Sequence, residues 1–214
     1  MAKHTKHTSL TRRESGNFAP NEIAILGATC GVIADLVNQV SKELSNYKLA
    51  YFDASHAKSL DTARDDKNLS EYVFHHEGNL QITTFGNINK FEQRLQFAQY
   101  DFVFINGNHY AGSKQIIFLD PKKEASINKR IDQISDVQFF VKMTSEVAPF
   151  QLLKDKFSNW NEIPQYEMID VKKITNHIAN IVKETIPTIK GLVLVGGKST
   201  RMGTDKSQLN YFGK

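Results

Sequence analysis

The chain lacks several of the features that define common protein classes. It has a single cysteine, Cys30, so no intramolecular disulfide can form, and a lone thiol is typical of a reducing compartment. No stretch of 18 apolar residues occurs, so the sequence predicts no transmembrane helix. The basic N-terminal stretch has no apolar central segment of the kind a secretory signal needs. These absences predict a cytoplasmic protein with no membrane partner.

Positive charge is concentrated at the N-terminus rather than spread over the sequence. The chain has 27 basic and 23 acidic residues, and the excess is accounted for by Lys3, Lys6, Arg12 and Arg13, in a stretch without acids. The rest of the chain is electrically balanced, which argues against a nucleic-acid partner. Residues 1–20 carry few apolar side chains and are expected to form a flexible basic arm.

Short apolar runs alternate with amphipathic stretches between residues 21 and 186. The run Glu22–Leu26 is followed by a glycine-containing turn, a helical spacing of apolar residues over Val32–Ser45, and a second run at Lys48–Ala54. This order predicts an α/β domain with a mostly parallel sheet flanked by helices. Further strands are expected at Leu80–Phe85, Asp101–Ile105, Gln115–Leu119 and Val137–Val141, and further helices at Asn89–Gln99, Phe150–Phe157 and Val171–Glu184.

The most informative motif lies in the last thirty residues. An apolar run, Ile189–Val195, leads directly into the loop GGKSTRMGTDK, residues 196–206. Two adjacent glycines let backbone N–H groups point at an anion, Arg201 offers a forked donor to phosphate oxygens, and Lys206 offers a mobile charge. The loop does not fit the Walker A pattern. It predicts a nucleotide-phosphate site, with a basic surface turn as the plainer alternative.

The stretch LVGGKSTRMGTDKSQL, residues 194–209, resembles the signature loop of the molybdenum cofactor guanylyltransferases, and more loosely the wider nucleotidyltransferases of the sugar-nucleotide-pyrophosphorylase type. The resemblance implies transfer of GMP from GTP to the molybdopterin cofactor, with Mg²⁺ as cofactor and release of pyrophosphate. It also implies catalytic roles for Arg201, at the β- and γ-phosphates, and Lys206, at the α-phosphate. The implied nucleotide-binding residues are Leu194, Val195, Gly196, Gly197 and Lys206.

The resemblance places this loop at the beginning of a second domain. In that family the aspartates that hold Mg²⁺ lie further along, which here would be beyond Lys214. Residues 187–214 are therefore expected to be the first strand and loop of a truncated, Rossmann-like nucleotidyltransferase domain, separated by Pro187 from the α/β domain at 21–186. We expect no guanylyl transfer by the chain alone.

The turn after the first strand stands where an α/β nucleotide-binding domain has its phosphate loop. A P-loop ends in Gly-Lys-Ser/Thr, whereas Gly31 is followed by apolar Val32 and Ile33. With the stretch DFVFINGNHYAGSKQIIFLD, residues 101–120, this opening resembles the molybdopterin-guanine dinucleotide biosynthesis adapter proteins, which implies a P-loop-like three-layer domain. The degenerate phosphate loop would consist of Gly27, Ala28, Thr29, Cys30 and Gly31, with backbone amides as its donors.

Cys30 allows two interpretations. It could be a reactive thiolate at the start of a helix, or a small residue buried beneath that helix. No histidine or lysine lies beside it in the sequence, which favours burial.

No metal site is predicted. Adjacent histidines on a strand point to opposite faces, and no cysteine or aspartate lies at ligand spacing around them. Asp53 and Asp101 flank strands and could hold Mg²⁺, although an aspartate at a strand edge is more often a cap. The histidines considered for a metal site are His56, His75, His76 and His109.

Two classes of function follow. The first is an enzyme, the N-terminal part of a guanylyltransferase with GTP and molybdopterin as partners. The second is a non-enzymatic module that binds a nucleotide or the cofactor and takes part in assembly. A third, narrower alternative is a nucleotidyltransferase acting on another phosphorylated substrate. The sequence permits a homodimer and does not fix the base specificity.

Overall fold

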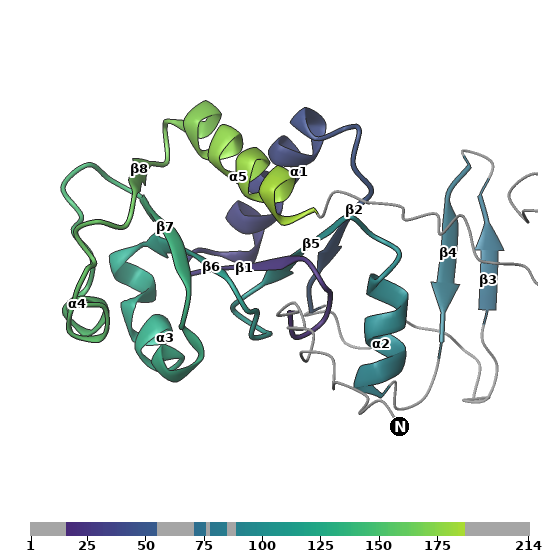
Figure 1. Cartoon of the computed structure of the whole chain (residues 1–214), viewed down its shortest axis with the longest axis horizontal. Helices are drawn as coiled ribbons and strands as arrows, with labels where there is room; N and C mark the ends of the chain where they lie inside the picture. Colours follow the sequence, from purple (N-terminus) through teal and green to yellow (C-terminus); the bar gives the residue numbers. More distant parts are fainter. Residues whose placement is uncertain (1–15, 55–70, 76–77, 85–88, 187–214) are drawn as a thin grey trace, which may run out of the picture.

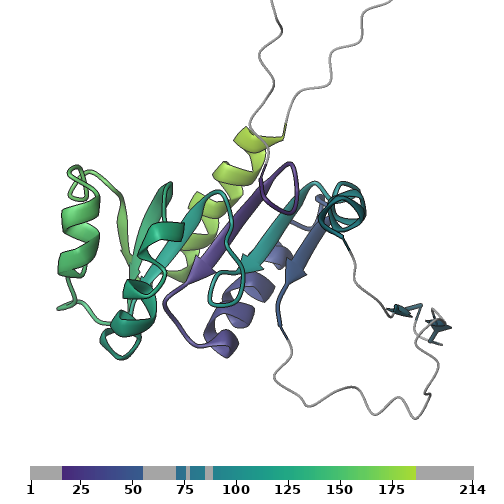
Figure 2. The same cartoon turned by 90° about the horizontal axis from the view of Figure 1, so that it is seen from below.

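The computed structural model describes residues 16–54, 71–75, 78–84 and 89–186. Its body is a six-stranded sheet in the order β2-β5-β1-β6-β7-β8, in which every neighbouring pair is parallel (Figures 1 and 2). The predicted mostly parallel sheet flanked by helices is thereby confirmed. The strands are β1 (Glu22–Leu26), β2 (Leu49–Phe52), β5 (Phe102–Asn106), β6 (Gln115–Leu119), β7 (Val137–Lys142) and β8 (Gln165–Glu167).

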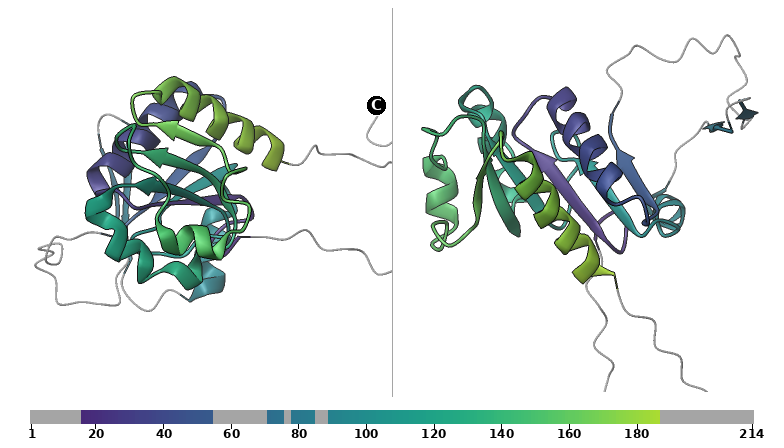
Figure 3. Two further views of the ribbon diagram at one scale, coloured as in Figure 1. Left: turned by 90° about the vertical axis from the view of Figure 1, so that its left-hand side faces the viewer. Right: turned by 90° about the horizontal axis from the view of Figure 1, so that it is seen from above.

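Helices cover both faces of the sheet. The long helices α1 (Cys30–Glu43) and α5 (Val171–Thr185) lie side by side on one face (Figure 3), while the opposite face carries α3 (Glu124–Asn128) and α4 (Gln151–Lys156). Helix α2 (Lys90–Phe97) contributes Phe97 to an apolar cluster beside β5. Two 3₁₀ turns, η1 (Pro121–Lys123) and η2 (Ile131–Gln133), flank α3. None of the described helices is long and apolar enough to cross a bilayer.

The sequence explains which strands are central. Strands β1, β5 and β6 are buried along their whole length, as expected for parallel strands covered on both faces. The larger core, between the sheet and α1 with α5, contains Phe102, Phe104, Phe118 and Phe139, all fully buried. The periodic apolar stretches predicted as helices do form α1, α2, α4 and α5.

The expected strand near residue 80 has a different place from the other strands. It forms β4 (Leu80–Thr83), which pairs in antiparallel register with β3 (Glu71–Phe74) as a separate two-stranded sheet. The sequence analysis did not predict β3, β8 or α3, which are only three to five residues long.

The folded body begins before the first strand. The buried carboxylate of Glu22 accepts hydrogen bonds from the backbone N–H groups of Asn17, Phe18 and Ala19, at 2.7 to 2.9 Å, and from that of Ser113 at 2.9 Å. Ala19 is only 1% exposed. Residues 16–19, which were expected to belong to the flexible basic arm because residues 1–20 carry few apolar side chains, therefore pack against the body. The predicted guanylyltransferase loop lies outside the described residues.

Candidate functional site

The candidate site lies at the carboxyl ends of three adjacent strands, β2, β5 and β1. Open parallel sheets bind ligands at this edge, because the connecting loops and the helix N-termini converge there. The segments that follow the three strands supply the site residues. They are the link from β1 to α1, Asp53 after β2, and the turn at residues 107–110 after β5.

The link between β1 and α1 is short. Only Gly27, Ala28 and Thr29 separate the strand from the helix, which begins at Cys30. Thr29 caps the helix, its Oγ1 accepting from the N–H of Val32 at 3.4 Å. Gly31 therefore belongs to the first helical turn, so the expected helix start at Val32 is two residues too late. The helix begins at Cys30 because the Thr29 side chain accepts from a backbone N–H that would otherwise lack an intrahelical partner.

Asn108 closes this link from the neighbouring turn. Its Oδ1 accepts from the N–H of Gly27 at 3.3 Å, and its Nδ2 donates to the carbonyl oxygen of Ala28 at 2.8 Å. The Asn108 carbonyl in turn accepts from the guanidinium of Arg130. The P-loop motif is eight residues long, and its last positions, at the start of the helix, supply a lysine and a hydroxyl. Here the three-residue link is tied to another turn, and apolar Val32 and fully buried Ile33 stand after Gly31 in place of the lysine and the hydroxyl residue.

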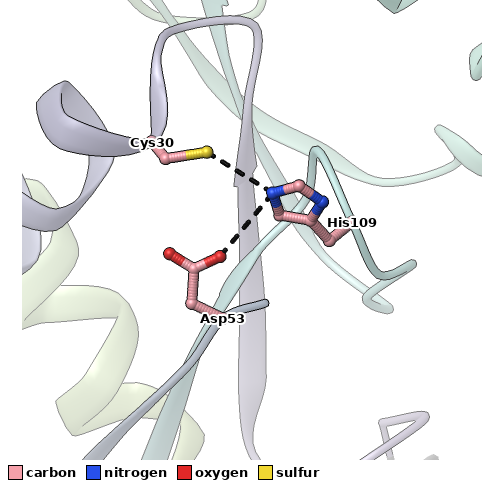
Figure 4. Close-up of side chains that lie close together, drawn as sticks. All are labelled: Cys30, Asp53 and His109. Carbon is pink, nitrogen blue, oxygen red and sulfur yellow. Dashed lines mark hydrogen bonds and ion pairs between the residues drawn. The ribbon is translucent and has the colours of Figure 1, made fainter. Parts of the chain in front are cut away.

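Cys30 is half-buried and meets a histidine that is distant in sequence. Its Sγ lies 3.4 Å from Nε2 of His109, and the same Nε2 lies 3.8 Å from Oδ1 of Asp53 (Figure 4). One polar atom from each of the three residues lies within 4.8 Å of the others. The prediction that Cys30 is a small buried residue beneath the helix is therefore wrong.

Asp53 is held by three donors. Its Oδ1 accepts from the N–H of Ala54 at 2.7 Å and from Nδ2 of Asn106 at 2.8 Å, and its Oδ2 accepts from the Tyr51 hydroxyl at 2.9 Å. Burial alone would raise the pKa of Asp53, but these hydrogen bonds and the nearby His109 outweigh it, so the pKa is lowered. Burial, followed by the hydrogen bond to Asp53, raises the pKa of Tyr51. The pair thus stays as carboxylate and neutral phenol.

The geometry is not that of a nucleophilic relay. In a Cys-His-Asp triad the thiol and the carboxylate contact opposite ring nitrogens, because the carboxylate orients the ring while the other nitrogen takes the proton. Here sulfur and carboxylate both approach Nε2 of His109 (Figure 4). Three polar atoms directed at one point can instead hold a cation between them.

The cluster revises several predictions about single residues. His109 converges with Cys30 and Asp53, whereas the sequence analysis grouped it with other histidines. His75 lies after β3, and His56 and His76 fall outside the described residues. Asp101 is a cap, as expected, since its Oδ2 accepts from the N–H of Lys48 at 2.7 Å. The missed signal was that Cys30, Asp53 and His109 each follow a strand of one parallel sheet.

The predicted catalytic and nucleotide-binding residues near the C-terminus are not placed by the structure. They lie outside the described residues, so their roles stay predictions. They are Leu194, Val195, Gly196, Gly197, Arg201 and Lys206.

Sheet order and layer arrangement together define a P-loop-like three-layer α/β domain in which three residues link β1 to α1. The chain is similar in fold to the X-ray structure of a MobB protein homologue from Bacillus stearothermophilus, with a TM-score of 0.51 at 12% identity, over 77% of this chain and 99% of that one. A crystal structure of molybdopterin-guanine biosynthesis protein B gives 0.49 at 13% identity (76% and 99% covered), and Bacillus subtilis MobB gives 0.47 at 13% (73% and 96%). No protein-family model and no curated protein matches the sequence. At such identities the likeness concerns the fold.

Proposed function

We propose that this chain acts in the biosynthesis of the molybdopterin guanine dinucleotide cofactor. Two features that do not depend on each other support this. The described body is similar in fold to a MobB protein homologue from Bacillus stearothermophilus. Separately, residues 194–209 resemble the signature loop of the enzymes that attach GMP to molybdopterin.

We assign the described body a binding and assembly role rather than nucleotide hydrolysis. The observation that carries this assignment is the three-residue link between β1 and α1, which Asn108 ties down at Gly27 and Ala28. Hydrolysis by a P-loop domain relies on a lysine at the β- and γ-phosphates and on a hydroxyl that helps to hold Mg²⁺. The first helical turn offers neither at Val32 or Ile33.

Mg²⁺ does not fit the described cluster. This ion binds oxygen ligands in near-ideal octahedral geometry, whereas Cys30 and His109 present sulfur and nitrogen. We therefore assign no Mg²⁺-dependent step to the described residues.

The proposed chemistry belongs to the C-terminal loop. A phosphate oxygen of molybdopterin attacks the α-phosphorus of GTP in line, and the bond to the leaving pyrophosphate breaks. In this proposal Lys206 offsets charge at the α-phosphate, and Arg201 offsets the charge that grows on the pyrophosphate. The glycines at 196 and 197 let the backbone approach the nucleotide.

GTP binding by the loop is tested with two lysine variants. Lys206→Ala removes a charge-assisted contact of about 1.5–3 kcal/mol, so GTP affinity should fall roughly 10- to 100-fold. Lys198→Ala is the matched control, because Lys198 lies in the same loop but is not among the residues to which the resemblance assigns a role, so its removal should leave the affinity unchanged. Calorimetric titration with GTP measures the affinity of each variant. If Lys206→Ala bound GTP as tightly as Lys198→Ala, the role assigned to Lys206 would be refuted. Repeating it with CTP and UTP separates a guanylyltransferase from a nucleotidyltransferase of another specificity.

The assembly role is tested by reconstitution. Molybdopterin, GTP and Mg²⁺ are incubated with a purified molybdenum cofactor guanylyltransferase, with and without residues 1–214, and the dinucleotide formed is measured by chromatography. We expect the chain to raise the yield when molybdopterin is limiting and to form no product by itself. An unchanged yield would reject the assembly role, and product from the chain alone would make it an enzyme.

A further inference from the structure

The side chains of Cys30, Asp53 and His109 converge at the carboxyl ends of β2, β5 and β1. We propose that these three side chains bind a zinc ion and leave its fourth coordination position for an exchangeable ligand. This inference goes beyond the proposed function and does not depend on it. Its basis is the geometry of the three ligand atoms, the groups that hold them, and their chemical type.

The spacing of the ligand atoms suits a tetrahedral ion. Bonds of about 2.3 Å to sulfur, about 2.0 Å to nitrogen and about 2.1 Å to oxygen place sulfur about 3.6 Å from nitrogen, and nitrogen about 3.4 Å from oxygen. The observed separations are 3.4 Å between Cys30 Sγ and His109 Nε2, and 3.8 Å between His109 Nε2 and Asp53 Oδ1. Shifts of about 0.2 and about 0.4 Å would bring these two separations to the tetrahedral values. The sulfur-to-oxygen separation is at most 4.8 Å, against about 3.6 Å in the same geometry.

A second set of contacts fixes the ligands before any ion arrives. Asn106 is fully buried at the end of β5, and its Nδ2 donates to Asp53 while its carbonyl oxygen accepts from the N–H of His109 at 3.1 Å. Tyr51 donates to the other oxygen of Asp53. An ionised carboxylate offers about four acceptor positions, two on each oxygen. Oδ1 of Asp53 already accepts from Ala54 and Asn106, so a cation bound to Oδ1 would take the place of one of these donors, whereas Oδ2 keeps one position beside the Tyr51 hydroxyl. Metal-binding carboxylates are characteristically hydrogen-bonded in this way.

The third ligand is set by the helix. Cys30 is the first residue of α1, which is 14 residues long and capped by Thr29. A thiol that coordinates a divalent ion does so as the thiolate. With the thiolate and the carboxylate each carrying one negative charge, a divalent ion would make the centre neutral.

The ligand types select zinc. One sulfur, one imidazole nitrogen and one carboxylate oxygen form a mixed set, which suits Zn²⁺ and its substitute Co²⁺ and does not suit Mg²⁺ or Ca²⁺. Three protein ligands are typical of zinc sites that keep an open position, whereas structural sites use four. The side chains of His109 and Asp53 remain 22% and 27% exposed, so a water molecule or a solute can reach that position.

Cobalt substitution provides the test, and the sequence makes its readout unambiguous. Chelator-treated chain 1–214 is titrated with Co²⁺ and followed by absorption spectroscopy. Binding should produce a sulfur-to-cobalt charge-transfer band in the near ultraviolet and the intense visible bands of a four-coordinate ion, and Zn²⁺ should abolish both. Because the chain has one cysteine, any such charge transfer reports on Cys30.

Three variants separate the proposed centre from binding by sulfur alone. Cys30→Ser should remove the charge-transfer band, while Asp53→Asn and His109→Gln should each weaken Co²⁺ binding at least tenfold. His75→Gln is the matched control and should change nothing, since His75 follows β3, in the two-stranded sheet that is separate from the six-stranded sheet, and does not belong to the cluster. Circular dichroism of each metal-free variant establishes that it is folded.

Two results would overturn the proposal. One is the absence of a charge-transfer band at saturating Co²⁺ with folded wild-type chain. The other is a band whose affinity is the same in wild type, Asp53→Asn and His109→Gln, which would mean that Cys30 alone binds the ion. X-ray absorption of the zinc form should show one sulfur at about 2.3 Å with nitrogen or oxygen at about 2.0–2.2 Å. All of these readouts are independent of cofactor synthesis.

Discussion

Two glycines four residues apart should respond to alanine in opposite directions. Gly27 has a φ of +89°, in the left-handed region, and a Cβ added there would stand 2.3 Å from the carbonyl oxygen of Phe118 and 2.9 Å from Cδ1 of Ile127. Gly31 lies in the first turn of α1, and a Cβ there would have nothing within 4 Å. Comparing the two substitutions therefore separates two effects on the free energy of unfolding: that of the left-handed turn at Gly27, and that of replacing a glycine in a helix by alanine.

The magnitudes can be worked from the structure. For Gly27→Ala the left-handed backbone costs roughly 1–2 kcal/mol, and the overlap with the β6 backbone adds about 1–3 kcal/mol. The free energy of unfolding should fall by about 2–5 kcal/mol. For Gly31→Ala it should rise by roughly 0.5–1 kcal/mol, because alanine loses less conformational entropy in a helix.

Urea denaturation followed by circular dichroism measures both changes. If the two variants have equal m-values, the difference between their denaturation midpoints, multiplied by m, gives the difference between their free energies of unfolding. A Gly27→Ala protein whose stability lies within about 0.5 kcal/mol of wild type would refute the reasoning, since surface substitutions without special features fall in that range.

Three further predictions follow from single side chains. Glu22→Gln places an NH₂ group among four backbone donors and should lower the free energy of unfolding by about 1–3 kcal/mol in urea denaturation, with no loss expected if those hydrogen bonds were immaterial. Asn108→Ala removes the acceptor of the Gly27 amide and the donor to the Ala28 carbonyl, so the Gly27 amide should show faster hydrogen exchange, and unchanged protection of that amide would contradict the closure. Burial lowers the pKa of His177, so the unfolded chain binds more protons between the two values. The contribution of His177 is thus complete above pH about 6.5 and declines as pH falls through the folded pKa. An NMR titration midpoint above 6.5 would contradict this.

The sequence predicts the centre of the fold well because its signals there are local. Strands such as β5 and β6 are continuous apolar runs, and helices α1 and α5 have a clear apolar period. Strand β8 was missed because it has three residues, none of them fully buried, and it is defined by its pairing with β7. Pairing across a sheet leaves little trace in so short a segment.

The candidate site was harder to predict for a related reason. Cys30 and His109 are 79 positions apart, and nothing in the sequence near either residue indicates the other. Their meeting depends on β1 and β5 being neighbours in the sheet. The departure of the β1–α1 link from the P-loop motif was easier to predict, since the residues at 32 and 33 are apolar in the sequence. The closure of this link by Asn108 depended on the same strand order.

The solitary thiol also makes the sheet edge easy to observe. Because Cys30 is half-exposed and has no competitor elsewhere in the sequence, an electrophilic fluorophore would attach at one known point without any engineering of the chain. The rate of that attachment depends on access to the sulfur, so anything that occupies the edge, whether ion, nucleotide or protein, would slow it. The protein with its natural sequence can therefore be screened for ligands of this edge by measuring the rate at which Cys30 is labelled.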